Sequence, residues 1–357
     1  MAVYINGIGN ISPQQTENNS HFLEEVVDHY GKSLSCVEPN YRNYINGRYL
    51  RRMSRVIKMG VSAAKICLAE VEVSDPDAII VGTGLGCLED TEKFLRAIYK
   101  SNEQSVSPTQ FIQSTHNTVA SQIAIMLGCN NYNFTYVHRG FSFESALQDA
   151  LMQFSEDDEP KNILVGGLDE STESYLNITR RLSQWKSKEF SQLQLLANHL
   201  RGSLPGEGAA FFMLSNQISD NSYAQIQAVR MMYKPKDEAF IHSEINDFLQ
   251  ENKVNKKDVD LVLLGVNGDS RIDNIYKYVE ENVFTNTPMG YFKHLCGEYK
   301  TATAFGLWLA AQILEKQQVP DVVKLRPFEA KNIKQILIYN NYSNINHTLL
   351  LIRHAQL

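Results

Sequence analysis

The chain has 357 residues, of which 43% are hydrophobic and 21% are charged, with a formal net charge of −6. This composition predicts a globular protein with a large core, and the negative charge argues against nucleic-acid binding, which needs a basic face. No segment reaches the ~20 apolar residues of a membrane span, and the N-terminus lacks the basic and apolar regions of a secretory signal. We therefore expect a cytoplasmic protein.

The cysteines predict neither disulfides nor a metal site. They are odd in number and widely spaced, and none forms a CxxC pair, so they are expected to be small buried hydrophobic residues. No cofactor is expected, because the sequence contains no complete nucleotide or metal motif. The cysteines are Cys36, Cys67, Cys87, Cys129 and Cys296.

The first half of the chain alternates predicted strands and helices. Between residues 53 and 67, apolar and small residues recur every three or four positions, which indicates an amphipathic helix with a small-residue face. The polar segment 172–200 is expected to be an irregular surface excursion. The other predicted helices are 88–99, 118–127 and 143–154, and the predicted strands are 3–8, 77–82, 132–137, 161–167 and one that follows Gly208.

The second half repeats this alternation without a clear repeat of sequence. No Pro/Ser-rich linker lies near the midpoint, so we expect two packed halves, 1–218 and 219–357, that form one compact unit. The predicted strands are 221–232, 260–265, 335–340 and 347–353, and the predicted helices are 239–252, 275–283 and 301–316.

Residues 134–150, FTYVHRGFSFESALQDA, predict a strand, a sharp turn and a helix. In many acyl-transfer enzymes this arrangement places a nucleophile at a helix N-terminus. Here the apex reads His138-Arg139-Gly140, without a cysteine, and the nearby hydroxyl of Ser142 already falls inside the predicted helix. The chain has the turn of such an enzyme without an evident nucleophile.

Six motifs in their order and spacing resemble the β-ketoacyl-[acyl carrier protein] synthases. The resemblance covers most of the chain and implies the α/β thiolase-like fold, in which two packed βα halves form α-β-α-β-α layers. The motifs are RRMSRVIKMGVSAA (51–64), IIVGTGLGCLED (79–90), SPTQFIQSTHNTVASQIAIMLG (107–128), ILVGGLDE (163–170), PGEGAAFFML (205–214) and KHLCGEYKTATAFG (293–306).

The resemblance also implies where catalytic residues should stand. Family members use a cysteine that forms an acyl thioester and two histidines that assist decarboxylation and stabilise the enolate. The cysteine position falls on Gly140, or on Arg139 if the turn is shifted by one residue. The two histidine positions fall on Asn267 and Glu298, while Lys293 matches the family lysine near the second histidine.

A fourth departure lies near the C-terminus, where the family has a Phe-Gly-Phe-Gly-Gly loop and this chain has NNYSNINH at 340–347. Each replaced position has more than one interpretation. Arg139 either ends a strand or points toward a partner or acyl head group, with Glu144 or Asp149 offsetting a cation at a helix N-terminus. Asn267 could donate to a thioester carbonyl, and Glu298 could act as a base or form an ion pair with Lys293 or Lys300.

Other candidate sites are weaker. His294 and Cys296 stand two residues apart, where side chains diverge on a helix or strand, so direct activation of the thiol is not expected. The glycines at 82–86 lack the complete dinucleotide and phosphate-loop signatures, which disfavours a nucleotide site. His116 is expected at the dimer seam that the resemblance implies.

The leading hypothesis is a non-catalytic subunit similar to the chain-length factors, which pair with an active ketosynthase in type II polyketide, aryl polyene or related bacterial fatty acid and polyketide pathways. The alternative is an active 3-oxoacyl synthase that uses an unusual residue such as Cys296 or His138. A third possibility is a freestanding acyl-binding or regulatory homodimer. The chain length, starter unit and pathway product are not fixed by the sequence.

Two surfaces are assigned to partners by the same resemblance. Acyl carrier proteins are acidic, so a basic run is a candidate docking face, although it could also be a solvated helix face or a set of buried ion pairs. Four aromatic residues near the elbow are candidates for tunnel or interface positions, or for plain core. The basic run is Arg48, Arg51, Arg52, Arg55 and Lys58, and the aromatic residues are Phe134, Tyr136, Phe141 and Phe143.

Overall fold

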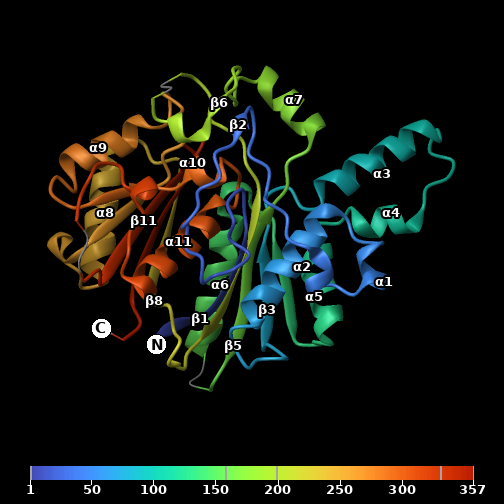
Figure 1. Ribbon diagram of the computed structural model, residues 1–357, viewed down its shortest axis with the longest axis horizontal. Coiled ribbons are helices and arrows are strands. Elements are labelled where there is room, and N and C mark those ends of the chain that lie inside the picture. The colour runs from blue at the N-terminus through green and yellow to red at the C-terminus, as the bar shows by residue number, and fades with distance from the viewer. Residues whose placement is uncertain (1, 157–158, 198–199, 330–331, 357) are drawn as a thin grey trace.

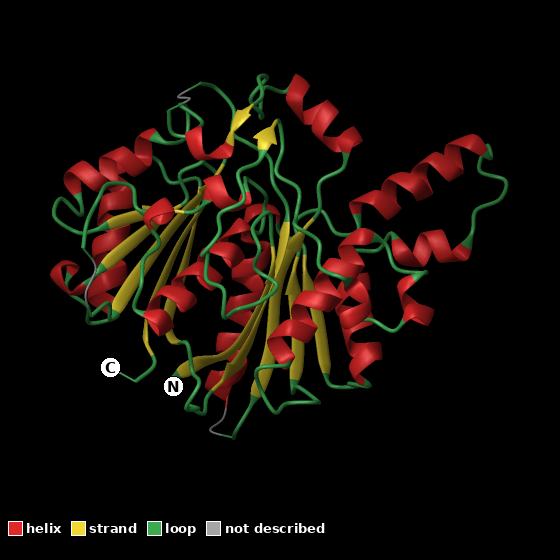
Figure 2. Cartoon of the chain, viewed as in Figure 1, coloured by secondary structure: helices red, strands yellow, loops and turns green. Residues whose placement is uncertain are grey.

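The computed structural model describes residues 2–156, 159–197, 200–329 and 332–356. Within these residues ten strands form one mixed sheet, and two short strands pair separately at the top of Figure 1. Strands and helices alternate along the chain, as predicted (Figure 2). The large sheet contains β1 (Val3–Ile11), β3 (Ala78–Gly82), β4 (Tyr132–Tyr136), β5 (Asn162–Asp169), β7 (Gly208–Ser215), β8 (Ala224–Tyr233), β9 (Leu261–Leu264), β10 (Met289–Tyr291), β11 (Gln335–Tyr342) and β12 (Asn346–His354), and the short pair is β2 (Tyr30–Gly31) and β6 (Phe190–Ser191).

The helices follow from local sequence signals. The predicted helix 118–127 is confirmed as α5, which ends where Gly128 takes the left-handed conformation, with φ at 69°. In the part of the chain that the structure describes, no helix has both the length and the apolar character needed to cross a membrane. The helices are α1 (Gly47–Leu50), α2 (Arg55–Leu68), α3 (Leu88–Lys100), α4 (Pro108–Gln113), α5 (Thr118–Leu127), α6 (Ser142–Glu156), α7 (Glu173–Arg181), α8 (Glu238–Glu251), α9 (Asn274–Asn282), α10 (Lys293–Cys296) and α11 (Ala302–Lys316).

The large sheet uses one strand pattern twice. From the centre outward, the first half runs β1, β7, β5, β3, β4 and the second runs β8, β12, β11, β9, β10. In each half the two pairings nearest the centre are antiparallel and the two outer pairings are parallel. The middle strand of each half, β5 or β11, therefore has one antiparallel and one parallel neighbour. An antiparallel contact between β1 and β8 joins the halves. The architectural repeat inferred from the sequence is therefore confirmed, and β4 with α6 corresponds to β10 with α11.

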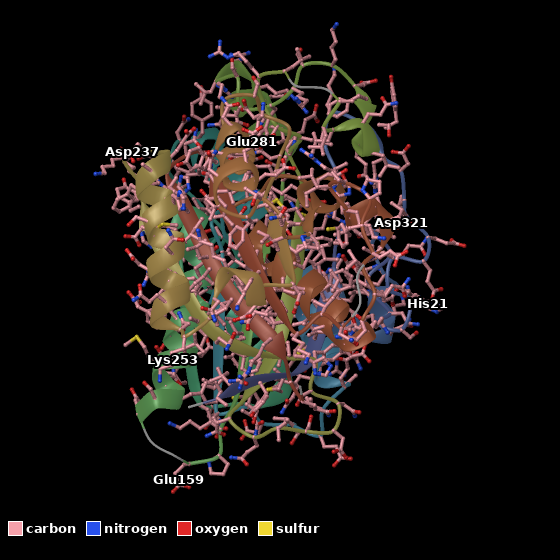
Figure 3. The ribbon with its side chains drawn as sticks, turned by 90° about the vertical axis from the view of Figure 1, so that its left-hand side faces the viewer. His21, Glu159, Asp237, Lys253, Glu281 and Asp321 are labelled. Atoms are coloured by element: carbon pink, nitrogen blue, oxygen red, sulfur yellow. The ribbon has the colours of Figure 1, made fainter. Side chains whose placement is uncertain are left out.

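The two halves enclose a helical layer. Helices α6 and α11 lie between them and share one hydrophobic core with both, around Phe143, Phe212 and Trp308. On the outside, α2 and α5 cover the first half, and α8 and α9 cover the second. Figure 3 shows α8 on that outer surface, between Asp237 and Lys253. The layers follow the α-β-α-β-α order that the resemblance implies.

The structure differs from the sequence-based expectations at three places. The segment 172–200 is not irregular throughout, because it contains α7, whose first turn is capped by the Thr172 hydroxyl accepting a hydrogen bond from the Tyr175 amide at 3.3 Å. The short elements β10 and α10 were not predicted. Residues 340–347 are mostly strand, since β11 and β12 form a tight hairpin there. The division at 218/219 falls in the connection between β7 and β8 and stays a prediction.

The two edges of the sheet differ in how they are covered. On β10, all three residues are buried, and the segment after α11 covers the edge, with the Leu325 amide donating to the Met289 carbonyl at 2.9 Å. On β4, the first three residues are exposed and the last two are half-buried. An open strand edge offers unpaired backbone groups to another strand, so β4 is the edge available to a partner.

Candidate functional site

The predicted strand, turn and helix at 134–150 are confirmed. Strand β4 leads into a single 3-10 turn and then α6. The Ser142 hydroxyl accepts a hydrogen bond from the His138 amide and donates to the Arg139 carbonyl, both at 2.8 Å. Ser142 is fully buried and its hydroxyl closes the turn, so it is a structural cap rather than a nucleophile.

Arg139 stands at the sharpest point of this elbow. Its φ of 51° lies in the left-handed region, which is costly for a residue with a side chain. Its side chain is exposed at the N-terminal end of α6, where a cation is disfavoured. The expected offset by Glu144 or Asp149 is wrong. Asp149 accepts from the Tyr132 hydroxyl at 3.1 Å, and Glu144 points into the core.

Glu144 is a buried acid in the first turn of α6. One carboxylate oxygen accepts a hydrogen bond from the Thr348 hydroxyl at 3.1 Å, and the other has no hydrogen-bond partner within the described chain. Burial raises the pKa of the Glu144 carboxyl to about 7, although the Thr303 and Thr348 hydroxyls and the nearby Lys293 ammonium oppose the shift. The inner layer therefore contains an acid that is poorly solvated when ionised.

The structure brings together the three other positions that the resemblance singled out. The Lys293 ammonium lies 2.9 and 2.8 Å from the two carboxylate oxygens of Glu298, and the Asn267 amide donates to Glu298 at 2.6 Å. Lys293 also donates to the Asn341 carbonyl at 3.2 Å. Lys293, Glu298 and Asn267 are all buried. We refer to these three residues as the buried triad.

The buried triad is itself held in place. Asp273 accepts hydrogen bonds from the Asn267 and Gly268 amides at 3.1 and 2.7 Å, and burial raises the pKa of the Asp273 carboxyl to about 6. Because Glu298 is engaged by an ammonium and an amide, its carboxylate is a structural ion-pair partner rather than a free base. The ion-pair interpretation of Glu298 with Lys293 therefore has the support of the geometry, whereas Lys300 bonds to the Tyr175 hydroxyl at 3.0 Å.

Burial disfavours the reactive form of the alternative nucleophile Cys296, although the nearby Lys293 ammonium opposes this effect. Cys296 is fully buried, and burial raises the pKa of its thiol, which disfavours the thiolate. His294 is also buried and stacks on Tyr291 with 3.8 Å between ring centres, and burial lowers the pKa of its imidazole to about 3. His138 is exposed and its ring packs against Phe141. All five cysteines of the chain are buried, as predicted.

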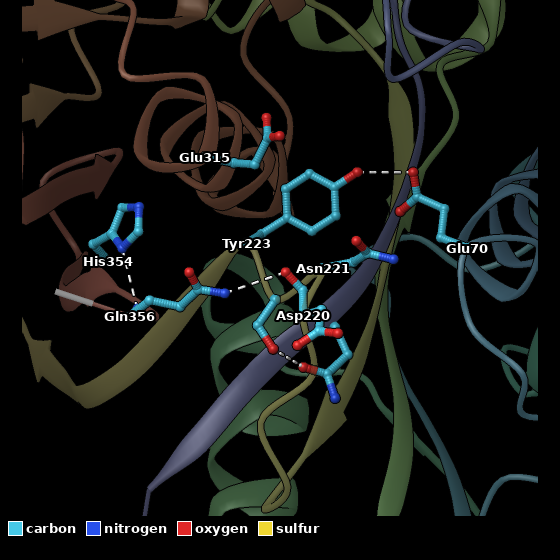
Figure 4. Close-up of a pocket in the computed structure, with 9 residues that line it drawn as sticks. Glu70, Asp220, Asn221, Tyr223, Glu315, His354 and Gln356 are labelled. Atoms are coloured by element: carbon cyan, nitrogen blue, oxygen red, sulfur yellow. Dashed lines mark hydrogen bonds between the residues drawn. The ribbon is translucent and has the colours of Figure 1, made fainter.

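The hollow beside the triad is small. Its volume is about 50 Å³, and it is lined by Asn267, Glu298 and Tyr342 among others. A much larger hollow, about 480 Å³, lies away from the elbow near the start of β1 and the end of β12. Figure 4 shows its polar lining, in which Tyr223 donates to Glu70 at 2.8 Å. Carboxylates and amides make this larger space unsuited to an apolar acyl chain.

Comparison with known proteins identifies the fold of the chain. A family model described as the N-terminal domain of β-ketoacyl synthase matches residues 41–192. The structure of the ishigamide ketosynthase/chain length factor superposes with a TM-score of 0.80 at 15% identity, covering 99% of this chain and 98% of that one. The chain has the thiolase-like ketosynthase fold.

Two further structures share the ketosynthase fold. A ketosynthase (ApeO) in complex with its chain length factor (ApeC) from Xenorhabdus doucetiae gives a TM-score of 0.73 at 16% identity, covering 99% of this chain and 98% of that one. A type II PKS acyl-carrier protein in complex with its ketosynthase gives 0.71 at 15% identity, covering 99% of each chain. None of the curated proteins matches the sequence significantly.

Two acids hold the framework of the ketosynthase fold, and neither was predicted to have a role. Asp169 accepts from the Gly84 and Leu85 amides at 2.9 Å and from Thr301 at 3.0 Å, so the glycine loop at 82–86 binds a carboxylate of the chain itself. Glu207 accepts from both terminal nitrogens of Arg55, at 2.7 and 2.5 Å. The sequence did contain a signal for both residues. Each acid adjoins an apolar strand, Asp169 in LDE at 168–170 and Glu207 in GEG at 206–208, and an acid in such a place is buried only when it is paired or hydrogen-bonded.

These contacts separate one residue of the basic run, which is ion-paired, from the others. Arg55 belongs to the interior, where it joins Glu207 and Glu38, so the ion-pair interpretation holds for this residue. Arg48, Arg51 and Arg52 are exposed, and their docking role stays a prediction. The four aromatic residues near the elbow also differ in burial. Phe141 and Phe143 are core residues, whereas Phe134 is 45% exposed on β4 and Tyr136 is half-buried.

The open edge of the ketosynthase fold is lined by apolar side chains. Tyr132 and Phe134 stack on β4, and the exposed His116 lies in the segment between α4 and α5. Figure 1 shows α3 and α4 projecting beyond this edge as an arm, and of the residues in α3 only Asp90 is buried. The exposed apolar side chains on β4, directly after it, on α5 and α6 and on the arm are Ile125, Tyr132, Phe134, Val137, Met152, Leu95, Tyr99, Phe111 and Ile112.

Proposed function

We propose that this chain is a non-catalytic member of the ketosynthase family that pairs, through β4 and the adjoining arm, with a catalytic ketosynthase. In this role it would act as a chain-length-factor-type subunit of a bacterial type II polyketide, aryl polyene or fatty acid pathway. The observation that carries the proposal is the combination of an elbow without a nucleophile and a strand edge, that of β4, which no strand in the described part of the chain covers. The first argues against chemistry in this chain, and the second argues for assembly.

The site chemistry supports a non-catalytic role. Condensation needs a thiolate at the elbow and two neutral imidazoles beside it. Arg139 and Gly140 occupy the elbow, while Asn267 and Glu298 occupy the two histidine positions and bond to each other. The triad neutralises the charge of Lys293 inside the protein, so no charged group there remains free for an enolate or carboxylate.

The open edge supports a partner of the same fold. Exposed apolar side chains lie on β4 and on the neighbouring helices α5 and α6, and apolar surfaces on monomers are commonly interaction sites. A partner that presents an equivalent edge strand could continue the sheet across the interface. The similar structures of a ketosynthase with its chain length factor and of a carrier protein with its ketosynthase make these two protein classes the partners to test first.

The test combines purification with an activity assay. The chain would be expressed alone and together with the ketosynthase encoded nearest to it, then incubated with acyl- and malonyl-loaded carrier protein. We expect a heterodimer that makes polyketide, and no covalent acylation of this chain by mass spectrometry. Acylation followed by condensation by the isolated chain would identify an active synthase. A stable homodimer that does not bind the ketosynthase would contradict the proposed pairing.

An interface variant sharpens this test. Phe134→Glu places a charge on the open strand and should weaken heterodimer formation by about 100-fold, the size expected for a central aromatic contact. Tyr233→Glu is the matched control, because Tyr233 is an aromatic residue, 65% exposed, on β8. Equal pairing by the two variants would show that β4 is not the interface.

A further inference from the structure

Gly140 is a glycine for reasons of space. It is buried, and its φ does not lie in the left-handed region, so the backbone does not require glycine there. A Cβ atom on this residue would lie 2.9 Å from the Tyr342 Cβ and 3.0 Å from its Cγ and Cδ1. Carbon atoms in proteins pack at about 3.5 to 4.0 Å, so the volume that a side chain at 140 needs is already filled by Tyr342.

A tight hairpin sets the position of Tyr342. Tyr342 is the last residue of β11 and pairs with Asn346 of β12, and the Ile345 amide donates to the Tyr342 carbonyl at 3.1 Å. Two turn residues, Ser343 and Asn344, have φ values of 59° and 54°. Consecutive left-handed residues are typical of a type I′ hairpin turn, whose twist matches the flanking strands.

Contacts from three directions hold this hairpin. Within it, the Asn344 amide donates to the Asn341 side chain at 2.8 Å, and outside it the Asn344 side chain donates to the Arg271 carbonyl at 3.0 Å. The Asn341 carbonyl accepts from Lys293 of the buried triad. The Lys300 ammonium lies 5.9 Å from the centre of the Tyr342 ring, within the range of a cation–π contact.

The space left around Tyr342 cannot accept an acyl chain. The hollow that it lines together with Glu298 and Asn267 is about 50 Å³, enough for a few water molecules at about 10 to 15 Å³ each on the same measure. The elbow lacks a nucleophile, and the position of a side chain at 140 is already occupied by Tyr342. These are separate properties, because a cysteine could be placed at 140 without moving the hairpin only if residue 342 lost both the ring and the Cβ atom of Tyr342.

We propose that Tyr342, half-buried and fixed by the β11–β12 hairpin, is a plug that fills the space of a side chain at position 140, one of the two candidate nucleophile positions of this ketosynthase fold. The plug keeps this space closed independently of the missing cysteine. Supplying a thiol at 140 is then insufficient for acylation, and opening the space requires loss of the tyrosine side chain. This inference rests on the proposed non-catalytic function, to which it adds a steric cause.

The experiment introduces the thiol and the space separately. Gly140→Cys, Tyr342→Gly and the double variant Gly140→Cys/Tyr342→Gly would be treated with iodoacetamide under native conditions, because glycine at 342 also removes the Cβ atom that lies 2.9 Å from the Cβ position of residue 140. The thiolate displaces iodide, forming an S–C bond while the thiol proton passes to the buffer. The five native cysteines are buried and provide a low background, and Ser105→Cys in an exposed loop gives the reference rate.

We expect the introduced thiol of the double variant to be alkylated at least tenfold faster than the buried native cysteines, while Gly140→Cys alone loses thermal stability relative to Gly140→Cys/Tyr342→Gly. A stable Gly140→Cys protein that reacts as fast as the double variant would overturn the plug, as would a double variant whose introduced thiol reacts only at the background rate.

Tyr342→Ala alone gives a second readout that does not depend on the cysteine variants folding. Removing the ring should leave a cavity that binds phenol, so millimolar phenol should raise the Tm of Tyr342→Ala and not that of wild type or of Tyr233→Ala. No phenol response in Tyr342→Ala would contradict the proposal. Because these readouts involve no carrier protein or ketosynthase, their failure is distinguishable from failure of the proposed pairing.

Discussion

Two strand-to-helix junctions occupy equivalent places in the two halves of the molecule. The first joins β4 to α6 through His138, Arg139 and Gly140, and the second joins β10 to α11 through residues 292–301. In the first, the apex is exposed, left-handed and positively charged without an offsetting carboxylate. In the second, nearly every residue is buried, and the charge of Lys293 is neutralised by Glu298.

The difference shows where each junction gets its stability. The second depends on contacts within the chain, and β10 beside it is covered by the following segment. The first leaves its unfavourable features at the surface, next to the open strand β4. Strain at a surface persists when the rest of the fold is stable enough to hold it, and it is a common mark of functional sites. The comparison therefore separates a self-contained junction from one that leaves its strain, its charge and its strand edge at the surface.

The largest expected effect is in the second junction. Lys293→Met leaves the buried Glu298 without its cation and should reduce the free energy of unfolding by about 3 to 5 kcal/mol. The double variant Lys293→Met/Glu298→Gln should recover most of this loss, because no unpaired charge remains. Urea unfolding followed by circular dichroism measures both.

The control for this variant is Lys93→Met, which removes an exposed ion pair to Glu89 and should cost no more than about 1 kcal/mol. If Lys293→Met were as mild as Lys93→Met, the triad would not be the source of stability at this junction.

A smaller effect is expected from Glu144 in the first turn of α6. Its folded-state pKa of about 7 is above the ordinary glutamate value of about 4.3, so the folded protein holds the proton more tightly. Stability should therefore fall as pH rises from about 4.3 to 7, by up to about 3 kcal/mol for this group, and then level off. Glu144→Gln should remove that part of the pH dependence in urea unfolding at pH 5 and 8.

Glu170 provides the comparison, because burial also raises the pKa of its carboxyl to about 7. Glu170→Gln should remove a similar share of the pH dependence independently. A Glu144→Gln protein whose stability varies with pH as steeply as wild type would show that the acid in the inner layer is not ionising.

The smallest effect is expected at Arg139. Asparagine tolerates the left-handed conformation and carries no charge, so Arg139→Asn should stabilise the isolated chain by about 0.5 to 1 kcal/mol. Arg139→Lys keeps both unfavourable features and should leave the Tm unchanged. Destabilisation by Arg139→Asn would mean that the arginine supports the unpartnered chain, contrary to the contrast drawn between the two junctions.

Most of the fold was predictable because its signals are local. The helix 118–127 follows from its spacing and its terminal glycine, and the elbow follows from an apolar run that leads into a helical pattern. Helix α7 was missed because few of its residues are apolar, with only Leu176 and Thr179 buried. Strand β10 has three residues, too few to show a period.

The site was predictable only in part. Asn267, Glu298 and Lys293 were found by family resemblance, and an ion pair of Glu298 with Lys293 was among the alternatives, whereas no local pattern indicated that Asn267 would bond to Glu298. The contact of Tyr342 with Gly140 joins distant parts of the chain and depends on the turn at Ser343 and Asn344, which has no glycine to signal it. Such contacts are consequences of tertiary packing, which single-sequence patterns do not contain.

The open edge of β4 also affects the protein before assembly. A bare strand with apolar neighbours can pair with any similar strand, including that of a second copy or of a partly folded chain. Under the proposed pairing, synthesis in excess of the partner would favour aggregation and proteolysis, whereas matched synthesis would cover the strand as it forms. The supply of the two subunits, and not the stability of this chain alone, would set how much of it survives in the cell.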